Sequence, residues 1–402
     1  MSLNRFKEVN DKPIIVSKAT FWEYQCIDTM KYSRDRARQY QSGDLKEETI
    51  STQVKKIASL GANCISIGTP YDNEFKNYLN LWVKHARHSN LRVWFRGNWS
   101  GYEQWFDYPA LVSLDEHHQK TRQFIIENES MFENDDIFTS APEPENSEVF
   151  KPLFERDANI FRKFIVDSNQ AALDSFAKIN KKVKTNYISL SGGVANSMLD
   201  LDTIKSLDNT VTLDHYVKTP EIMNEYIEHY KSKLNAKVVL GEFGAPIPDI
   251  NGEMSQSEQA QFVTSILQVL AKQNKTIPAI NYWTLSDSST SLIDDSQNDK
   301  QVVEVIKKFY SPIKIFGRVS NSLSQQLSDV TISSTENIYT TTTDKNGNYE
   351  LIVPTGDEVN LKVILAGYDD YNLKIKDNGS QNIVLNKSSP DILYKIKEII
   401  TR

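Results

Sequence analysis

The stretch Lys237-Val-Val-Leu-Gly-Glu-Phe243 decides the fold of most of the chain. It is a short apolar run in which the one charged residue near its end, Glu242, stands between two glycines of a Gly-Glu-Phe-Gly segment. A run that is apolar on both faces is typical of a parallel strand covered by helices. We therefore predict a buried parallel strand over 237–243 that ends on a carboxylate.

Similar runs recur from residue 10 to about 310, and segments with helical periodicity separate them. The strand candidates span 14–21, 63–69, 92–98, 136–142, 185–191, 210–216, 237–243 and 279–285. The clearest helix candidates span 47–60, 156–179, 220–234 and 257–273, with Pro220 and Ser257 at two expected helix starts. Eight such pairs predict a (β/α)8 TIM barrel over residues 1–311, with a doubly wound open sheet as the structural alternative.

The helical periodicity stops after Ser311-Pro312, and runs rich in Val, Ile, Thr and Tyr alternate with turn signals. We place a domain boundary there and predict a small all-β sandwich over 312–402. Its strand candidates span 315–320, 329–334, 339–344, 348–354 and 359–367. We expect a hairpin turn at 344–348 (DKNGN) and a short amphipathic helix at 391–402.

Composition narrows the classes of function. The 402 residues carry a formal net charge of -7, which argues against nucleic acid because a phosphate-tracking protein needs a basic face. No run approaches the roughly 18 to 20 apolar residues that span a bilayer. The six histidines are scattered and no glycine-rich phosphate loop occurs, so we expect no metal and no cofactor.

The two cysteines, Cys26 and Cys64, fall in or near different predicted strands. We take this arrangement to exclude a disulfide framework and a cysteine-based zinc site, and we expect both to be small buried side chains. The location of the protein stays open. Secretion or the cell surface is favoured if an export signal preceded the opening Met-Ser-Leu.

Functional side chains of a TIM barrel gather at the carboxyl ends of its strands. Glu242 ends the seventh predicted strand, and Glu143 and Glu145 follow the fourth, which lies across the lumen. Two carboxyl groups that flank a glycosidic bond can hydrolyse it, and a separation of about 5 to 5.5 Å allows one to act as nucleophile. We expect Glu143 and Glu242 to form this pair, with Glu145 as the alternative acid.

Two further strand ends carry candidates for the same site. His215 and Tyr216 end the strand beside Glu242, and Tyr216 is the better candidate for a donor that keeps Glu242 ionised. Trp283 at the end of the eighth strand is predicted to stack on a sugar ring. For each of these residues, packing in the barrel is the alternative interpretation.

The mouths of the first and third predicted strands also carry aromatic and polar residues. We expect substrate contacts from Arg96, Asn98, Trp99 and Trp22, with a packing or surface role as the alternative for each. Arg96 is the strongest candidate of this group, because a charge near a strand end needs a carboxylate or hydroxyl partner.

This pattern resembles clan A of the glycoside hydrolases, which includes many cellulases and mannanases acting on β-linked glycans. The resemblance covers about residues 10–310 and rests on GEFG in the seventh strand, EPEN after the fourth, His215-Tyr216 and Trp283. It implies that Glu242 is the nucleophile and Glu143 the general acid and base. One departure is Pro142, which stands where the clan has an asparagine that hydrogen-bonds the 2-hydroxyl of the sugar.

The C-terminal segment resembles a carboxypeptidase regulatory-like module. The pattern consists of IFGRVS, TTTDKNGNYELIVPTG and AGYDDY, with Gly317, Asp344, Gly347, Tyr349 and Gly367. The resemblance implies a transthyretin-type sandwich that acts as a spacer or docks a partner.

The leading hypothesis is a retaining glycoside hydrolase that degrades an oligo- or polysaccharide. The alternative is a catalytically inactive barrel that binds glycan or organises an assembly through its sandwich. An unrelated TIM-barrel hydrolase or lyase is less favoured, because metal and phosphate motifs are absent from the sequence. A separation of Glu143 and Glu242 well beyond about 7 Å would favour the inactive barrel or an inverting enzyme.

Overall fold

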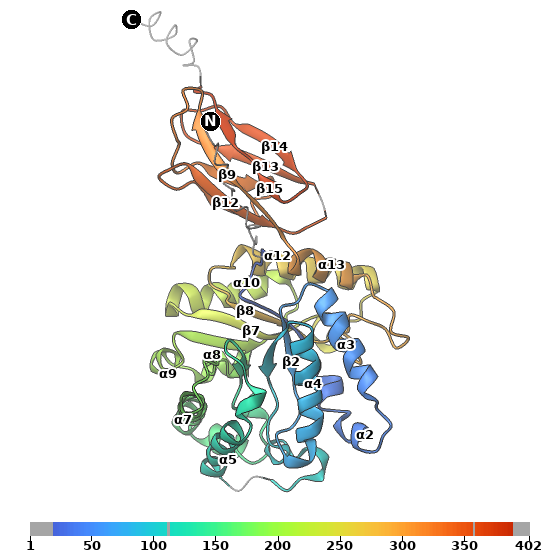
Figure 1. Ribbon diagram of the computed structural model, residues 1–402. Coiled ribbons are helices and arrows are strands. Elements are labelled where there is room, and N and C mark those ends of the chain that lie inside the picture. The colour runs from blue at the N-terminus through green and yellow to red at the C-terminus, as the bar shows by residue number, and fades with distance from the viewer. Residues whose placement is uncertain (1–18, 111–112, 357, 389–402) are drawn as a thin grey trace, which may run out of the picture.

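The computed structural model describes residues 19–110, 113–356 and 358–388. Eight parallel strands surrounded by helices form a barrel, and a separate set of strands forms two facing sheets (Figure 1). The predicted fold class, a (β/α)8 barrel followed by a small all-β sandwich, is confirmed. Within the described ranges, no helix combines the length and apolar character that crossing a bilayer requires.

The barrel strands follow sequence order around the sheet. They are β1 (Tyr24–Asp28), β2 (Cys64–Ile67), β3 (Arg92–Phe95), β4 (Ile137–Phe138), β5 (Ser189–Ser191), β6 (Thr210–Asp214), β7 (Lys237–Phe243) and β8 (Ala279–Tyr282). Strand β8 pairs with β1, and a parallel bridge between Ile137 and Lys184 joins β4 to the chain that leads into β5. These contacts close the sheet and bring all carboxyl ends to one mouth.

Helices cover the outside of the sheet. The longer ones are α3 (Glu47–Ser59), α4 (Lys76–His88), α5 (Leu114–Glu127), α7 (Ala158–Lys178), α10 (Pro220–Glu228), α12 (Gln256–Lys272) and α13 (Val302–Tyr310). Shorter ones are α1 (Met30–Ser33), α2 (Ala37–Gln41), α6 (Lys151–Arg156), α8 (Gly192–Met198), α9 (Leu201–Ser206) and α11 (Pro248–Asn251). Single turns are η1 (Asn73–Phe75), η2 (Ser100–Tyr102), η3 (Trp105–Asp107), η4 (Glu129–Met131), η5 (Pro144–Asn146) and the π-helical η6 (His229–Lys233).

The four helices predicted most clearly all exist as α3, α7, α10 with η6, and α12. Pro220 opens α10 as expected, but the cap of α12 is Ser255 and not Ser257. The Ser255 side chain accepts from the Glu258 backbone amide, and the Glu258 side chain accepts from the Ser255 amide. This reciprocal pair requires the acid three residues after the cap, a spacing that Ser257 does not have.

The first strand lies later in the chain than predicted. Of the predicted range 14–21, residues 14–18 lie outside the described part, and residues 19–21 are not in a strand. Strand β1 instead pairs through Cys26 with Cys64 on one side and Asn281 on the other. Trp22 therefore precedes β1 at the amino end of the barrel.

This position overturns the predicted substrate contact of Trp22. The side chain is 1% exposed and packs against the rings of Phe21 and Tyr310, at centroid distances of 5.3 and 6.4 Å. Catalytic mouths form at the opposite end of the strands. Trp22 is a core residue.

The prediction that excluded a disulfide is also wrong. Cys26 and Cys64 are register partners in β1 and β2, their Cα atoms are 4.4 Å apart, and their sulfurs are bonded. Both are buried, as expected. Placement in separate strands was no argument against pairing, because the βα unit sets consecutive strands side by side.

The C-terminal strands form two sheets that enclose a second core. The first contains β11 (Thr340–Thr342), β10 (Thr331–Ser334), β13 (Val359–Ile364) and β14 (Tyr371–Ile375), and the second β12 (Asn348–Val353), β9 (Ile313–Asn321), β15 (Gly379–Ser380) and β16 (Ile383–Leu385). Alternate side chains of β12, namely Tyr349, Leu351 and Val353, are buried, as expected for strands with one solvent-facing side.

The predicted turn at 344–348 exists, but it does not close a hairpin. It connects β11 in one sheet to β12 in the other. The Asp344 carboxylate accepts from the backbone amides of Asn346 and Asn348, and Gly347 has a φ of 75°. The turn itself was therefore predicted correctly. The predicted hairpin was wrong, because which strands pair depends on the rest of the two sheets. The helix predicted at 391–402 lies outside the described residues.

The sandwich packs beside α12 and α13 (Figure 1). The rings of Phe21 and Tyr339 are 6.0 Å apart, and the Thr355 amide donates to the Lys308 carbonyl at 3.1 Å. Because Phe21 precedes β1, the sandwich contacts the barrel away from the mouth. We retain the proposed domain boundary at 311/312, between α13 and β9.

Candidate active site

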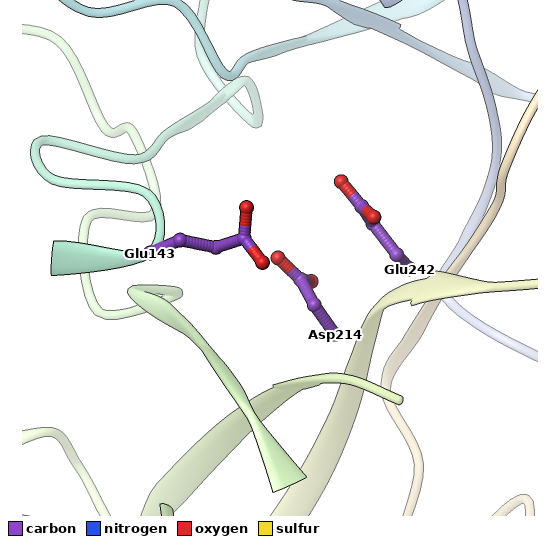
Figure 2. Close-up of side chains that lie close together, drawn as sticks. All are labelled: Glu143, Asp214 and Glu242. Carbon is purple, nitrogen blue, oxygen red and sulfur yellow. The ribbon is translucent and has the colours of Figure 1, made fainter. Parts of the chain in front are cut away.

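Three carboxylates from different strands converge at the mouth of the barrel. Glu143 follows β4, Asp214 ends β6 and Glu242 lies near the end of β7. One oxygen of each lies within 4.8 Å of one oxygen of the others, and Figure 2 shows the side chains pointing toward one another. The structure therefore brings together the predicted pair, Glu143 and Glu242, and adds Asp214.

Arg96 is the cation at the centre of this cluster. It follows β3, is 1% exposed, and its Nη1 donates to Glu242 Oε1 at 2.9 Å and Asp28 Oδ2 at 3.3 Å. Its Nη2 donates to Asp214 Oδ2 at 2.8 Å. Burial alone would lower the pKa of Arg96, but the charges of these three carboxylates raise it overall. The prediction that Arg96 needs a carboxylate partner is confirmed.

A bulge in β7 aims Glu242 into the mouth. Val239 belongs to the barrel interior and Leu240 to the layer under the helices, so simple alternation would point residue 242 outward. In the observed register, Leu240 pairs with Leu213 and Glu242 with Asp214, which leaves Gly241 as an extra residue. A bulge of this kind re-aims the following side chain.

Two donors hold the Glu242 carboxylate. Arg96 donates to one oxygen, and the Tyr216 hydroxyl donates to the other at 2.8 Å, which is the hydrogen bond predicted for Tyr216. Burial raises the pKa of Glu242 to about 8, and the charge of Asp214 adds to the rise. The guanidinium and the hydroxyl oppose this rise, because both stabilise the ionised form.

Glu143 lacks such support. Its backbone has a φ of 43°, and its amide donates to the Ser189 carbonyl at 2.9 Å. Among the described residues, its carboxylate forms no hydrogen bond or ion pair. Burial raises the pKa of Glu143 to about 8, with the Glu242 charge as the next cause. Since only Glu242 accepts hydrogen bonds that stabilise its ionised form, Glu143 is the better candidate for the protonated acid.

Glu145, the alternative acid, is directed elsewhere. Its Oε1 accepts from the Ser191 amide at the end of β5, at 2.7 Å. Burial raises the pKa of Glu145, and this hydrogen bond opposes the rise. Glu145 is outside the group of carboxylates that lie within 4.8 Å of one another.

Residues 315–400 match the family model of the CarboxypepD_reg-like domain. The resemblance inferred for the C-terminal segment is thereby confirmed. No curated protein sequence matches the chain.

Solved structures with the same fold include carbohydrate-active proteins. A GH5_18 variant from Bifidobacterium longum, in complex with Manβ1-4GlcNAc, aligns with a TM-score of 0.52 and 12% identity over 76% of this chain and 84% of that one. At this identity the alignment shows a shared fold.

Two further alignments have lower TM-scores. An endo-β-1,4-glucanase from Xanthomonas axonopodis pv. citri aligns at 0.46 and 13% identity, over 65% of this chain and 89% of that one. An FMN-binding β-glucuronidase from Facaelibacterium prausnitzii aligns at 0.46 and 12% identity over 83% of this chain. The chain spans about half the length of this β-glucuronidase, 53% of it.

His215 and Trp283 are two further predicted site residues, and they follow β6 and β8. The His215 ring packs on Tyr226 at 4.0 Å, and only its backbone amide contacts Glu242, donating to the carbonyl at 2.9 Å. Burial lowers the pKa of His215 to about 4, so the ring is neutral. Trp283 follows β8 and is half-buried, and its amide donates to the Phe243 carbonyl at 2.9 Å.

The two remaining candidates follow β3. Asn98 is buried, and its Oδ1 accepts from the Trp99 amide at 2.8 Å. The Trp99 ring packs against Phe124 of α5, at 6.0 Å between centroids, and beneath the Lys120 ammonium. The Trp99 ring also meets the Tyr71 ring at 6.0 Å, and these contacts favour the packing alternative.

Two acidic partners of Arg96, Asp28 and Asp214, were not among the predicted site residues. The predicted first strand ends before Asp28, and the residues predicted for the sixth strand were the two that follow Asp214. Both are polar residues that end an apolar strand, the same signal that identified Glu242. Asn281, in β8, was also missed, and its Nδ2 donates to Asp28 Oδ2 at 3.0 Å and to the Gly241 carbonyl at 2.8 Å.

A cluster of three carboxylates also has the donor chemistry that hard divalent cations prefer. Here, however, Arg96 already makes close contacts with both Asp214 and Glu242. The guanidinium therefore supplies the positive charge of this cluster.

Proposed function

We propose that the chain is a retaining glycoside hydrolase of β-linked glycans, with Glu242 as nucleophile and Glu143 as general acid and base. The observation that carries the proposal is the approach of their carboxylate oxygens to within 4.8 Å. Double displacement uses carboxyl groups about 5 to 5.5 Å apart, whereas inversion needs about 6.5 to 9.5 Å to admit a water.

In the first step, Glu242 attacks the anomeric carbon, and the bond from this carbon to the leaving oxygen breaks. Glu143 gives its proton to the leaving oxygen, so the aglycone departs as a neutral alcohol. Arg96 and Tyr216 stabilise the ionised form of Glu242, which is the form that attacks. The sugar is then an ester of Glu242.

In the second step, Glu143 is a carboxylate and acts as the base. It takes a proton from a water molecule, whose oxygen attacks the anomeric carbon and displaces Glu242. The product retains the configuration of the substrate, and both carboxyl groups return to their starting forms.

The Bifidobacterium longum protein with the same fold was solved with Manβ1-4GlcNAc, which makes this disaccharide a first substrate to test. The other substrates are aryl β-glycosides and oligosaccharides of β-glucan and β-mannan. Each is offered to the wild type and to Glu242→Ala, Glu143→Ala and Glu145→Ala, after circular dichroism has shown that each variant is folded.

Loss of either member of the pair should lower kcat by about 10²- to 10⁴-fold, whereas Glu145→Ala should lose much less. Azide should restore Glu242→Ala and give a glycosyl azide of inverted configuration. On activated aryl glycosides, azide should restore Glu143→Ala and give the retained configuration. These two products distinguish the nucleophile from the acid and base.

One observation favours the alternative, a catalytically inactive barrel that binds glycan: Pro142 replaces the amide side chain expected before Glu143. If the folded wild type turns over none of these substrates, or if both variants match it, the catalytic assignment is wrong. Binding of the same oligosaccharides by calorimetry would then identify the inactive glycan-binding barrel.

We also propose that the sandwich over residues 312–402 acts as a spacer or docking unit. The family match at 315–400 supports a module of this type.

A further inference from the structure

Asp214 is the member of the cluster that takes no part in the two steps above. It ends β6 and is 5% exposed. Its Oδ2 accepts from Arg96 at 2.8 Å, whereas its Oδ1 is buried and has no hydrogen-bond partner among the described residues. A buried hydrogen-bond acceptor without a donor lowers the stability of the fold, so the position of Oδ1 needs an explanation.

The local packing holds this carboxylate beside the catalytic pair. The bulge in β7 pairs Asp214 with Glu242. A Cβ on Gly241 would lie 2.3 Å from Asp214 Oδ1, so only glycine leaves room for the carboxylate there. Figure 2 shows the Glu143 side chain reaching toward Asp214 as well as toward Glu242.

We propose that Asp214 is a positioning residue that shares one proton with Glu143: the protonated Glu143 donates a hydrogen bond to the free Oδ1 of Asp214. The sharing of the proton follows from the geometry and the charges of the cluster. Its consequence for catalysis rests on the proposed function.

The charges around Asp214 require at least one bound proton. Among the described residues, Arg96, which follows β3, is the one cation paired with Asp28 of β1, Asp214 of β6 and Glu242 of β7. Glu143 reaches the same cluster from the loop after β4. Four ionised carboxylates against one guanidinium would leave a buried net charge of about -3, which is strongly unfavourable.

The remaining polar groups that face the cluster do not supply a second cation. Tyr216 donates to Glu242, Ser189 Oγ accepts from Arg96, and Glu145 is held by Ser191. Burial raises the pKa of Asp214 to about 8, and the charge of Glu143 adds to the rise, whereas Arg96 and the Ser189 hydroxyl oppose it. Two neighbouring carboxyl groups in this situation titrate as a pair with two macroscopic steps.

Shared protonation would serve both proposed steps. Glu143 gives its proton to the leaving oxygen while Glu242 loses its negative charge by becoming an ester, so the number of negative charges in the cluster stays the same. Asp214 remains ionised on Arg96. Its charge then makes Glu143 a stronger base for the water of the second step.

Carboxyl ¹³C NMR of protein labelled at glutamate tests the sharing without any substrate. The Glu143 resonance is assigned as the one lost in Glu143→Gln. In Asp214→Asn its upper pKa should be lower than in the wild type by about one unit or more, because the charge that the Glu143 proton faces is removed. Asp28→Asn is the matched control, because Asp28 also binds Arg96 but is not grouped with Glu143.

An unchanged pKa of Glu143 in Asp214→Asn would overturn the proposal, and so would an equal shift in Asp214→Asn and Asp28→Asn. If Asp214→Asn does not fold, protein labelled at aspartate gives the reciprocal test: the pKa of Asp214 should fall in Glu143→Gln, and an unchanged value would overturn the proposal. If the NMR result is positive but no substrate is turned over, proton sharing stands and the proposed function fails. If a substrate is found, the alkaline limb of kcat/KM should move to lower pH in Asp214→Asn and stay closer to the wild type in Asp28→Asn.

Discussion

At the scale of residues, the two predicted catalytic glutamates differ in what surrounds them. Glu242 has a guanidinium on one oxygen and a phenol on the other, whereas Glu143 lies in a buried position with Glu242 as a nearby charge. Burial raises the pKa of both groups, but only Glu242 accepts hydrogen bonds that stabilise its ionised form. A difference of this kind helps one site to hold an acid and a nucleophile at the same pH. The Tyr216 hydroxyl contributes to this difference through one hydrogen bond.

Tyr216→Phe should therefore raise the pKa of Glu242 and move the acidic limb of kcat/KM to higher pH. A hydrogen bond to a charged group contributes roughly 1.5 to 3 kcal/mol, so kcat/KM should fall about ten- to a hundredfold. The measurement is the pH profile on whichever glycoside proves to be a substrate. Tyr226→Phe is the matched control, because the Tyr226 ring packs on His215, whereas the hydroxyl that donates to Glu242 belongs to Tyr216. Equal losses in both variants would contradict the role given to Tyr216.

At the scale of elements, the bulge in β7 decides which way Glu242 faces. Gly241 serves it in two ways, since its carbonyl accepts from Arg96 at 3.0 Å and its missing Cβ makes room for Asp214. Gly244, the second glycine of GEFG, has a related role, because a Cβ there would lie 2.4 Å from the Trp283 carbonyl. The motif thus reflects close packing of β7 against β6 and β8.

Gly241→Ala should push the Asp214 carboxylate from its place and lower the free energy of unfolding by about 1 to 3 kcal/mol, the usual cost of overpacking. Activity should fall as well, because Arg96 and Glu242 share this packing. Gly193→Ala is the control: no atom lies within 4 Å of a Cβ there, and the residue is in α8, where alanine is favoured. Urea unfolding of both variants tests this difference. A Gly241→Ala protein as stable as the wild type would show that the bulge tolerates a side chain.

At the scale of the whole molecule, buried histidines and buried carboxyl groups should together set the pH range of stability. Burial lowers the pKa of His117 to about 3. The His117 Nε2 lies 2.9 Å from the Ser140 carbonyl oxygen. The stability that a depressed histidine contributes is present above its ordinary value of 6.5 and is lost as pH falls toward 3. Glu143 acts in the opposite direction: its contribution is present below 4.5 and is lost as pH rises through about 8.

The free energy of unfolding should consequently decrease as pH rises from about 6.5 to about 8, because the contribution of His117 is complete there while that of Glu143 is being lost. Glu143→Gln, which stays neutral, should flatten this decrease. Urea unfolding at a series of pH values measures both slopes. Identical slopes for the wild type and Glu143→Gln would show that folding does not raise the pKa of Glu143.

Much of this protein follows from local patterns in its sequence. The sequence was enough to predict seven of the eight barrel strands, the main helices and the C-terminal sandwich. It also predicted the pair of Glu143 and Glu242 at strand ends. Apolar periodicity and the rule that strand ends carry the chemistry need only neighbouring residues. The need of Arg96 for a carboxylate could likewise be inferred from its own chemistry and position.

Other features were decided only by the tertiary structure. The register of β1 put Asp28 at the mouth and Trp22 at the opposite end, and it paired Cys26 with Cys64. The bulge set Glu242 beside Asp214. Each of these features depends on hydrogen bonds between segments far apart in the chain, and a shift by one residue turns a side chain to the other face. Local periodicity carries no information about which register the neighbouring strands will select.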